Sequence, residues 1–171
     1  KLNVGDPLSD DTDIGPLVNS KALDNIESHV KDAISEGAEI FTGGERLTVR
    51  NKGYFYKPTI IGNITLKMRI VNGEVFGPVA PIVLANNEKE ALQIANDSQF
   101  GLGASIWTQD LEKAEKLSGN IKSGIVSINN VVVSDTRVPF GGIKNSGFGM
   151  ELSKYGMLEF VNIPLIFKNT F

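Results

Sequence analysis

Short apolar runs alternate with amphipathic stretches in the middle of the chain, and this alternation limits the possible folds more than any other feature. The predicted elements are strands over 79–84, 103–107 and 124–128, and helices over 88–97 and from Thr108, as N-cap, to Gly119. Strands that are joined through a helix lie parallel in one sheet, with the helices on its faces. The alternation therefore predicts an α/β fold built around a parallel sheet.

An amphipathic helix is also expected near the N-terminus, after a loop formed by residues 1–17. Its apolar face would consist of Leu23, Ile26, Val30, Ala33 and Ile34. Asn19 or Ser20 suits its N-cap, and Gly37 suits its end. His29 lies off the apolar face, so we expect it to be a solvated surface residue. Short strands are expected over 38–42 and 53–59, and one helical turn over 68–71.

The last apolar run, residues 158–167, follows a short predicted helix over 151–155 and has no helix after it. It contains Pro164, which cannot donate a hydrogen bond to a neighbouring strand. Proline is confined to the edges of sheets for this reason. We therefore expect a strand at a sheet edge or between subunits.

The composition limits which kinds of partner this protein can be expected to bind. The 171 residues are 41% hydrophobic and 22% charged, with a net charge of −3, which is typical of a globular protein and argues against nucleic-acid binding. No apolar run approaches the roughly 20 residues that span a bilayer, and residues 1–13 do not resemble a signal peptide. We expect a cytoplasmic protein without a membrane partner.

The chain has no cysteine and one histidine. These counts exclude disulfides, a cysteine nucleophile within these residues, a histidine-based catalytic triad and a zinc site of the common kinds. We accordingly predict no metal site. Because the sequence opens at Lys1 without a methionine, we expect it to be part of something longer.

Two segments combine residue types that could bind a ligand. In the segment 72–79, a carboxylate (Glu74) and an aromatic ring (Phe76) precede a Gly-Pro turn. A carboxylate can accept hydrogen bonds from both hydroxyls of a ribose, and a ring can flank a flat heterocycle. A solvated glutamate and a core phenylalanine explain the same pattern. After the strand that ends at Ile128, Ser134 and Arg137 could hold a carboxylate, although an ion pair between Asp135 and Arg137 is equally compatible.

A third segment, residues 139–149, contains four glycines. Gly142 and Gly147 have the spacing of a phosphate-binding P-loop, but Phe148 and Gly149 stand where that motif requires lysine and serine or threonine. The segment therefore fails as a phosphate cradle, and a tightly packed crossing loop is the simpler interpretation.

Taken in order, these segments resemble the C-terminal part of the NAD(P)-dependent aldehyde dehydrogenase superfamily. The resemblance covers essentially the whole chain. It rests on GDP (5–7), IGPL (14–17), GG (43–44), PT (58–59), EVFGPV (74–79), IAND (94–97), FGL (100–102), PFGG (139–142), Lys144, SG (146–147), Gly149, EL (151–152) and YG (155–156). The segment 134–149 is most similar to succinate-semialdehyde dehydrogenases.

The resemblance implies a role for five residues. Glu74 would bind the hydroxyls of the nicotinamide ribose, and Phe76 would lie beside the nicotinamide of NAD or NADP. Ser134 and Arg137 would hold the distal carboxylate of succinate semialdehyde, and Phe140 would form a wall of the substrate tunnel. Gly73 departs from the family, in which many members have a second acid here. Met150 stands where arginine is common, which puts in doubt any ion pair of that arginine.

The resemblance also implies a three-layer, Rossmann-like catalytic domain. Residues 1–156 would belong to it, and 157–171 would form the C-terminal oligomerisation strand and tail of a homodimer or homotetramer. The dinucleotide-binding domain, the catalytic cysteine that forms a thiohemiacetal and thioester, and the general base would lie outside this chain, which would then be inactive alone. The same chemistry on lactaldehyde or glyceraldehyde is an alternative, as is a non-catalytic α/β assembly module.

Overall fold

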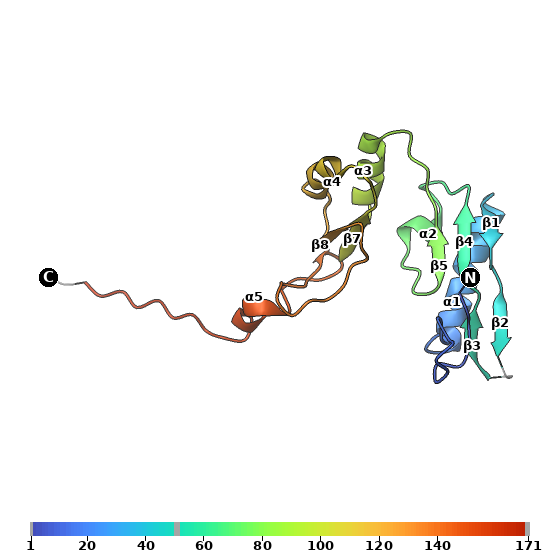
Figure 1. The fold of residues 1–171 in the computed structure, drawn as a ribbon, viewed down its shortest axis with the longest axis horizontal. Coiled ribbons are helices and arrows are strands. Elements are labelled where there is room, and N and C mark those ends of the chain that lie inside the picture. The colour runs from blue at the N-terminus through green and yellow to red at the C-terminus, as the bar shows by residue number, and fades with distance from the viewer. Residues whose placement is uncertain (1, 50–51, 170–171) are drawn as a thin grey trace. The chain divides into compact units, whose positions relative to one another are not determined.

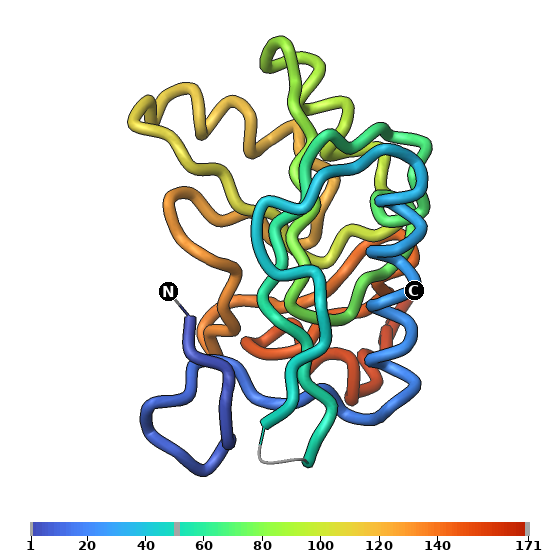
Figure 2. The backbone as a smooth tube through the Cα atoms, turned by 90° about the vertical axis from the view of Figure 1, so that its right-hand side faces the viewer, coloured from blue at the N-terminus to red at the C-terminus, as the bar shows by residue number. Residues whose placement is uncertain are grey.

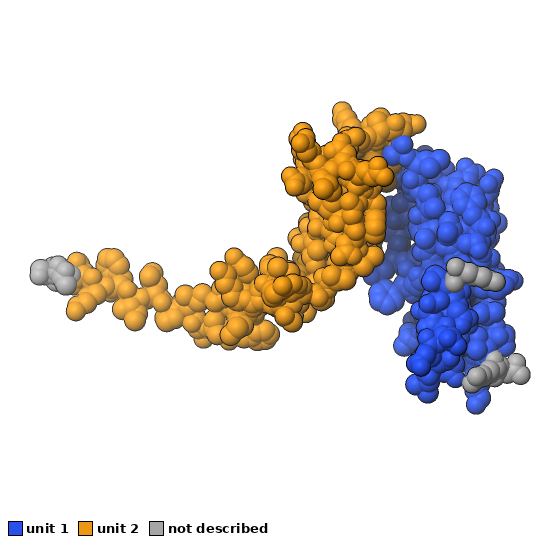
Figure 3. Space-filling model, viewed as in Figure 1, with its two compact units in different colours: residues 1–85 blue, residues 86–171 orange. Residues whose placement is uncertain are grey.

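The structure is a computed structural model that describes residues 2–49 and 52–169. The chain divides into two compact units, Lys1–Ala85 and Asn86–Phe171, which Figure 3 shows in different colours. Each unit is described by itself.

The long helix of the first unit is α1 (Ser20–Ser35). The Oδ1 atom of Asn19 accepts a hydrogen bond from the Ala22 amide at 2.9 Å, and Gly37 follows the helix with a φ of +99°, which favours glycine. Its buried residues are Leu23, Ile26, His29, Val30 and Ala33. The predicted helix and both of its ends are confirmed, but the prediction for His29 is wrong, because only 4% of this residue is exposed.

The strands of the first unit form two small sheets. They are β1 (Glu39–Thr42), β2 (Arg46–Val49), β3 (Lys52–Tyr56), β4 (Thr59–Gly62) and β5 (Val79–Pro81). In the three-stranded sheet β4 is central, antiparallel to β1 and parallel to β5, and β2 pairs with β3 as an antiparallel ribbon. The helical turn α2 (Arg69–Asn72) lies between β4 and β5 in sequence, where one turn was predicted.

The core of this unit lies between α1 and the strands. Figure 2 shows α1 running beside the strands, and its apolar face packs with Tyr56 of β3 and Ile61 of β4. Both residues are at most 1% exposed. The hydroxyl of Tyr56 is buried without a hydrogen-bond partner among the described residues, which is a cost that the packed ring must offset.

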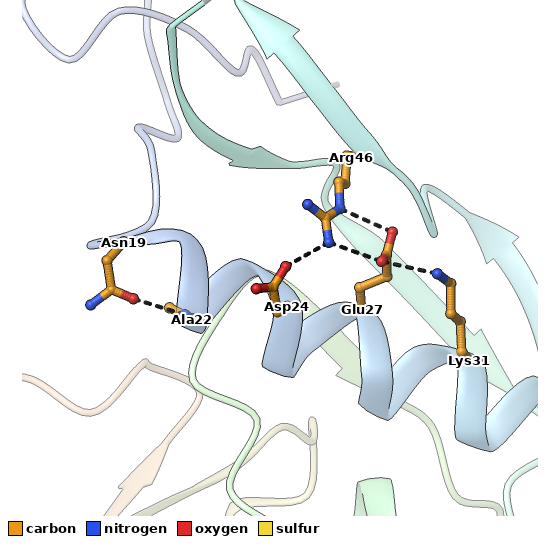
Figure 4. A network of polar contacts seen from close by, with 6 residues as sticks. All are labelled: Asn19, Ala22, Asp24, Glu27, Lys31 and Arg46. Atoms are coloured by element: carbon orange, nitrogen blue, oxygen red, sulfur yellow. Dashed lines mark hydrogen bonds and ion pairs between the residues drawn. The ribbon is translucent and has the colours of Figure 1, made fainter.

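A polar network ties the outer face of α1 to β2 (Figure 4). Arg46 donates to Glu27 at 3.0 and 3.1 Å and to Asp24 at 2.8 Å, and Lys31 lies 2.9 Å from Glu27. The hydrogen bonds from Arg46 and then from Lys31 lower the pKa of the Glu27 carboxyl to about 2, because both favour its charged form. The helix is therefore held to the ribbon by charge as well as by its apolar face.

The strand β5 differs from its prediction. An apolar strand over 79–84, buried on both faces, was expected, but the strand ends at Pro81, and Leu84 is 87% exposed. Among the described residues β5 pairs only with β4, so one of its edges has no partner. An apolar run can be buried only by the elements that cover it, and composition does not show whether they are present.

The second unit contains the predicted parallel connection. Its elements are α3 (Glu88–Asn96), β6 (Phe100–Gly101), β7 (Gly103–Ile106), α4 (Leu111–Ser118), β8 (Ile125–Ile128), β9 (Ile143–Lys144) and α5 (Ser153–Leu158). β7 and β8 pair in parallel, and α4 joins them and packs on β8 (Figure 1). The α/β class with parallel sheet pieces is thereby confirmed. Asp110, and not Thr108, is the N-cap of α4: its Oδ1 accepts from the Lys113 amide at 3.0 Å.

The described residues of the C-terminal segment form no strand. The predicted helix over 151–155 is found two to three residues later, as α5, and residues 162–169 have no regular structure. Leu165 and Phe167 are 92% and 86% exposed. Pairing of this segment with a second chain stays a prediction. No helix of the described residues is long and apolar enough to cross a membrane.

Candidate functional site

The segment 73–77 leads from α2 into the turn before β5. Its side chains alternate, as in an extended strand: Glu74 and Phe76 are exposed, whereas Val75 is half-buried and packs against both core clusters of the first unit. Phe76 is 80% exposed, so the alternative of a core phenylalanine is wrong. The segment therefore presents a carboxylate and an aromatic ring outward, two residues apart.

The loop that follows β8 holds Ser134 and Arg137. Ser134 is exposed, and Arg137 is held by Asp135: the Arg137 Nε atom donates to Oδ1 at 2.9 Å, and a terminal nitrogen donates to Oδ2. The pair raises the pKa of Arg137 and lowers the pKa of Asp135, since each charge favours the other. The ion pair that the sequence left open is thus present. It occupies Nε and one terminal nitrogen, and the other terminal nitrogen makes no hydrogen bond with the described residues.

Phe140 stands at the start of the glycine loop. It exchanges two backbone hydrogen bonds with Glu151, at 2.7 and 2.9 Å, and is half-buried. It borders a hollow of ≈ 310 Å³ that Phe148, Met150 and Glu159 also line. Phe140 therefore forms part of the wall of a concave surface.

The glycine loop itself is tightly packed. A Cβ atom on Gly124 would lie 1.8 Å from the carbonyl oxygen of Gly141, so the two backbones approach more closely than any side chain permits. Ser146 Oγ accepts from the Gly101 amide at 3.0 Å, and Lys144 Nζ donates to the carbonyls of Asn96 and Ser98 at 2.9 and 2.7 Å. The interpretation as a packed crossing loop is confirmed.

The structure brings the predicted residues together in two groups. Glu74 and Phe76 lie on one segment of the first unit, while Ser134, Arg137 and Phe140 lie on one loop of the second. No group of three or more histidine, cysteine, aspartate or glutamate residues that could hold a metal ion is found in the described part of the chain.

Sequence reasoning missed His29. Its imidazole is buried under Gly73, and its Nδ1 atom has no hydrogen-bond partner among the described residues. Burial is the main cause that lowers its pKa, and the nearby Arg69 adds to the effect while Asp32 opposes it. The burial of His29 could have been predicted from the sequence, because His29 follows Ile26 by three positions and therefore shares its helical face.

Comparisons with known proteins place this arrangement in a family. The sequence profile of the "Aldehyde dehydrogenase family" matches residues 1–166. This chain belongs to the aldehyde dehydrogenase family. It is 44% identical over 165 residues to "Succinate-semialdehyde dehydrogenase [NADP(+)] 1" of Mycobacterium tuberculosis (strain ATCC 25618 / H37Rv), a match that covers 96% of this chain and 36% of that protein. It is 40% identical over 168 residues to "Succinate semialdehyde dehydrogenase [NAD(P)+] Sad" of Escherichia coli (strain K12), covering 98% and 36%.

Solved structures of the family have the same fold. Betaine aldehyde dehydrogenase of Staphylococcus aureus, crystallised in complex with NAD+, is similar with a TM-score of 0.87 and 39% identity, over 92% of this chain and 32% of that one. The chain therefore spans about a third of the length of the aldehyde dehydrogenases that it matches. The similarity to these structures, together with the parallel pairs β4–β5 and β7–β8, assigns it to the Rossmann-like fold of the family.

Proposed function

We propose that this chain acts as part of an NAD(P)+-dependent aldehyde dehydrogenase that oxidises succinate semialdehyde to its acid. The observation that carries the proposal is the outward pair Glu74 and Phe76 on the segment that resembles the family's nicotinamide site. Residues 1–156 would contribute to the catalytic domain, and 157–171 would be the oligomerisation strand and tail.

The exposed residues of the segment 73–77 fit a nicotinamide riboside. The Glu74 carboxylate can only accept hydrogen bonds, which suits two vicinal hydroxyls, and the Phe76 ring offers an apolar face to a flat ring. Val75, packed in the core, would keep both side chains at a fixed spacing. A bound nicotinamide would supply the acceptor for the hydride of the aldehyde.

The loop 134–140 would recognise the distal carboxylate of the substrate. Arg137 has five N–H donors, and Asp135 engages only those on Nε and one terminal nitrogen, so the guanidinium can hold a second carboxylate on its other side. Ser134 would add a hydroxyl donor, and Phe140 would exclude water from the aldehyde end. The cysteine nucleophile and the glutamate that activates water would come from outside these 171 residues.

The test of the cofactor role is Glu74→Gln in the enzyme that carries this chain. Because an amide accepts only through one oxygen, the KM for NAD+ or NADP+ should rise by about tenfold, while the KM for the aldehyde stays within twofold. An unchanged KM for both dinucleotides would refute the assignment.

The test of the substrate is Arg137→Ala, with an uncharged aldehyde of equal length as the comparison. Catalytic efficiency for succinate semialdehyde should fall by about tenfold or more, because a charge-assisted hydrogen bond is lost, and efficiency for the uncharged aldehyde should not. If neither efficiency changed, another small aldehyde would replace succinate semialdehyde in the proposal. The 171-residue chain alone should oxidise no aldehyde.

We further propose that the enzyme that carries this chain is a cytoplasmic homo-oligomer. Sedimentation of the purified enzyme would test its oligomeric state.

A further inference from the structure

We infer that His29 is a positioning residue for the cofactor segment, because its ring and the side chain of Ile26 form the surface of α1 on which Gly73 and Gly77 rest. The inference deepens the proposed function and rests on it, since it concerns the residues that hold Glu74 and Phe76 in place.

Two glycines bracket the segment, and both touch α1. A Cβ atom on Gly73 would lie 2.6 Å from Cε1 of His29, and a Cβ atom on Gly77 would lie 2.0 Å from Cδ1 of Ile26. Gly73 has a φ of −93° and a ψ of 159°, which any residue adopts. Glycine is therefore required at position 73 for space and not for its backbone angles.

The contact with α1 is reinforced through Arg69, which precedes Gly73 by four residues. The Gly73 amide donates to the Arg69 carbonyl at 2.7 Å, and the Arg69 guanidinium donates to Ser28 Oγ at 3.0 Å and to Asp32 at 2.6 Å. Ser28 and Asp32 flank His29 on α1. The start of the segment is thus fixed to the helix by polar contacts around a buried ring.

The remaining anchors lie at Val75 and Gly77. Val75 packs into both core clusters, and the Gly77 amide donates to the Val75 carbonyl at 3.0 Å, which closes a tight turn around Phe76. Gly73 and Gly77 rest against α1 and Val75 packs in the core, while Glu74 and Phe76 are both exposed. Any change that lifts Gly73 off His29 would rotate the Glu74 carboxylate.

The experiment uses four variants of the enzyme that carries this chain: Gly73→Ala, His29→Ala, the double variant and Glu74→Gln. Gly73→Ala should raise the KM for the dinucleotide by about tenfold and leave the KM for the aldehyde within twofold. His29→Ala, which creates a void and no clash, should also raise the KM for the dinucleotide. This second variant allows the test to be made if Gly73→Ala does not fold.

The double variant separates positioning from general loss of stability. The void left by His29→Ala can accept the new methyl group at position 73, so the double variant should bind the dinucleotide better than Gly73→Ala alone. Phe55→Leu is the matched control: Phe55 is 4% exposed and lies outside both clusters, so it should lower the melting temperature without changing either KM.

The outcomes distinguish this inference from the function it rests on. If Glu74→Gln raises the KM for the dinucleotide while Gly73→Ala and His29→Ala leave it unchanged, the positioning role is wrong and the cofactor site stands. If the fold-increases in the dinucleotide KM caused by Gly73→Ala and by His29→Ala simply multiply in the double variant, the positioning role is also wrong. If Glu74→Gln has no effect, the cofactor site is wrong and the inference falls with it.

Discussion

A methyl group added at Gly124 would collide with the backbone of the glycine loop that carries Phe140. The Cβ atom of Gly124→Ala would lie 1.8 Å from the Gly141 carbonyl oxygen and 2.8 Å from its carbonyl carbon. Ordinary contact begins at 3.4 Å, so Gly124, which immediately precedes β8, and the loop would have to separate by about 1.6 Å. Neither side can yield by rotating a side chain, because both contacts are to main-chain atoms.

The loop is anchored, so the separation should move Phe140. Ser146 holds it to the Gly101 amide, and Phe140 itself is paired with Glu151. Overpacking of this kind costs about 1–3 kcal/mol of stability, and a displacement near 1 Å at a substrate wall can cost roughly 100-fold in rate. We therefore expect Gly124→Ala to lower kcat/KM for the aldehyde by about 100-fold in the enzyme that carries this chain, and to lower its melting temperature.

Gly119→Ala is the control for this prediction. The nearest heavy atom to its new Cβ is 4.0 Å away, and its φ of −67° suits alanine, so stability should be unchanged or slightly higher. Steady-state kinetics and thermal unfolding of both variants measure the changes in kcat/KM for the aldehyde and in melting temperature. Wild-type efficiency and melting temperature for Gly124→Ala would refute the close approach of Gly124 and the loop.

Three further predictions concern the first unit. Ile61→Ala should lower the free energy of unfolding by about 2–5 kcal/mol in urea titrations, because Ile61 is fully buried; a loss below 1 kcal/mol would argue against the core as described. Tyr56→Phe should leave that free energy unchanged or raise it by about 1 kcal/mol, since the buried hydroxyl has no hydrogen-bond partner among the described residues. A marked loss of stability would show that the hydroxyl does have a partner. The pKa of Glu27 is lowered in the folded state, so the stability it adds is complete above its ordinary value of 4.5 and disappears as the pH falls toward about 2. Arg46→Gln should weaken this acid dependence in unfolding measured against pH, and an identical pH profile would contradict the network.

Local periodicity predicted the elements whose partners lie nearby in sequence. The helix α1 was located with both ends, since its apolar face, the Asn19 cap and the Gly37 stop are all local. The parallel pair β7–β8 followed from the alternation of apolar and amphipathic stretches, because a helix between two strands allows few other arrangements.

Elements whose burial depends on a distant partner were harder to predict. The apolar run 79–84 gave no sign that β5 would end at Pro81, and the run 158–167 gave no sign that it would form no strand with the described residues. His29 was misplaced because a single polar residue on a helix was assigned by type and not by its spacing from Ile26. The N-cap moved from Thr108 to Asp110 because both side chains suit that position and only the geometry of the turn decides between them.

The candidate site was predictable in its residues and not in its contacts. Glu74 and Phe76 were chosen from their order in the segment 72–79, and the structure exposes both. The ion pair of Arg137 with Asp135 was one of two alternatives that the sequence left open. The contact between His29 and Gly73 joins residues 44 positions apart, and spacing along the chain does not predict such a contact.

We propose above that this chain works within an enzyme that oxidises an aldehyde with NAD+ or NADP+. The most direct measurement follows the ultraviolet absorbance of reduced nicotinamide when that enzyme meets succinate semialdehyde, with succinate quantified in parallel. We expect equal amounts of succinate and reduced nicotinamide, and none of either from the 171-residue chain alone. Absence of reduced nicotinamide with succinate semialdehyde, lactaldehyde and glyceraldehyde, or turnover by the isolated chain, would contradict this proposal.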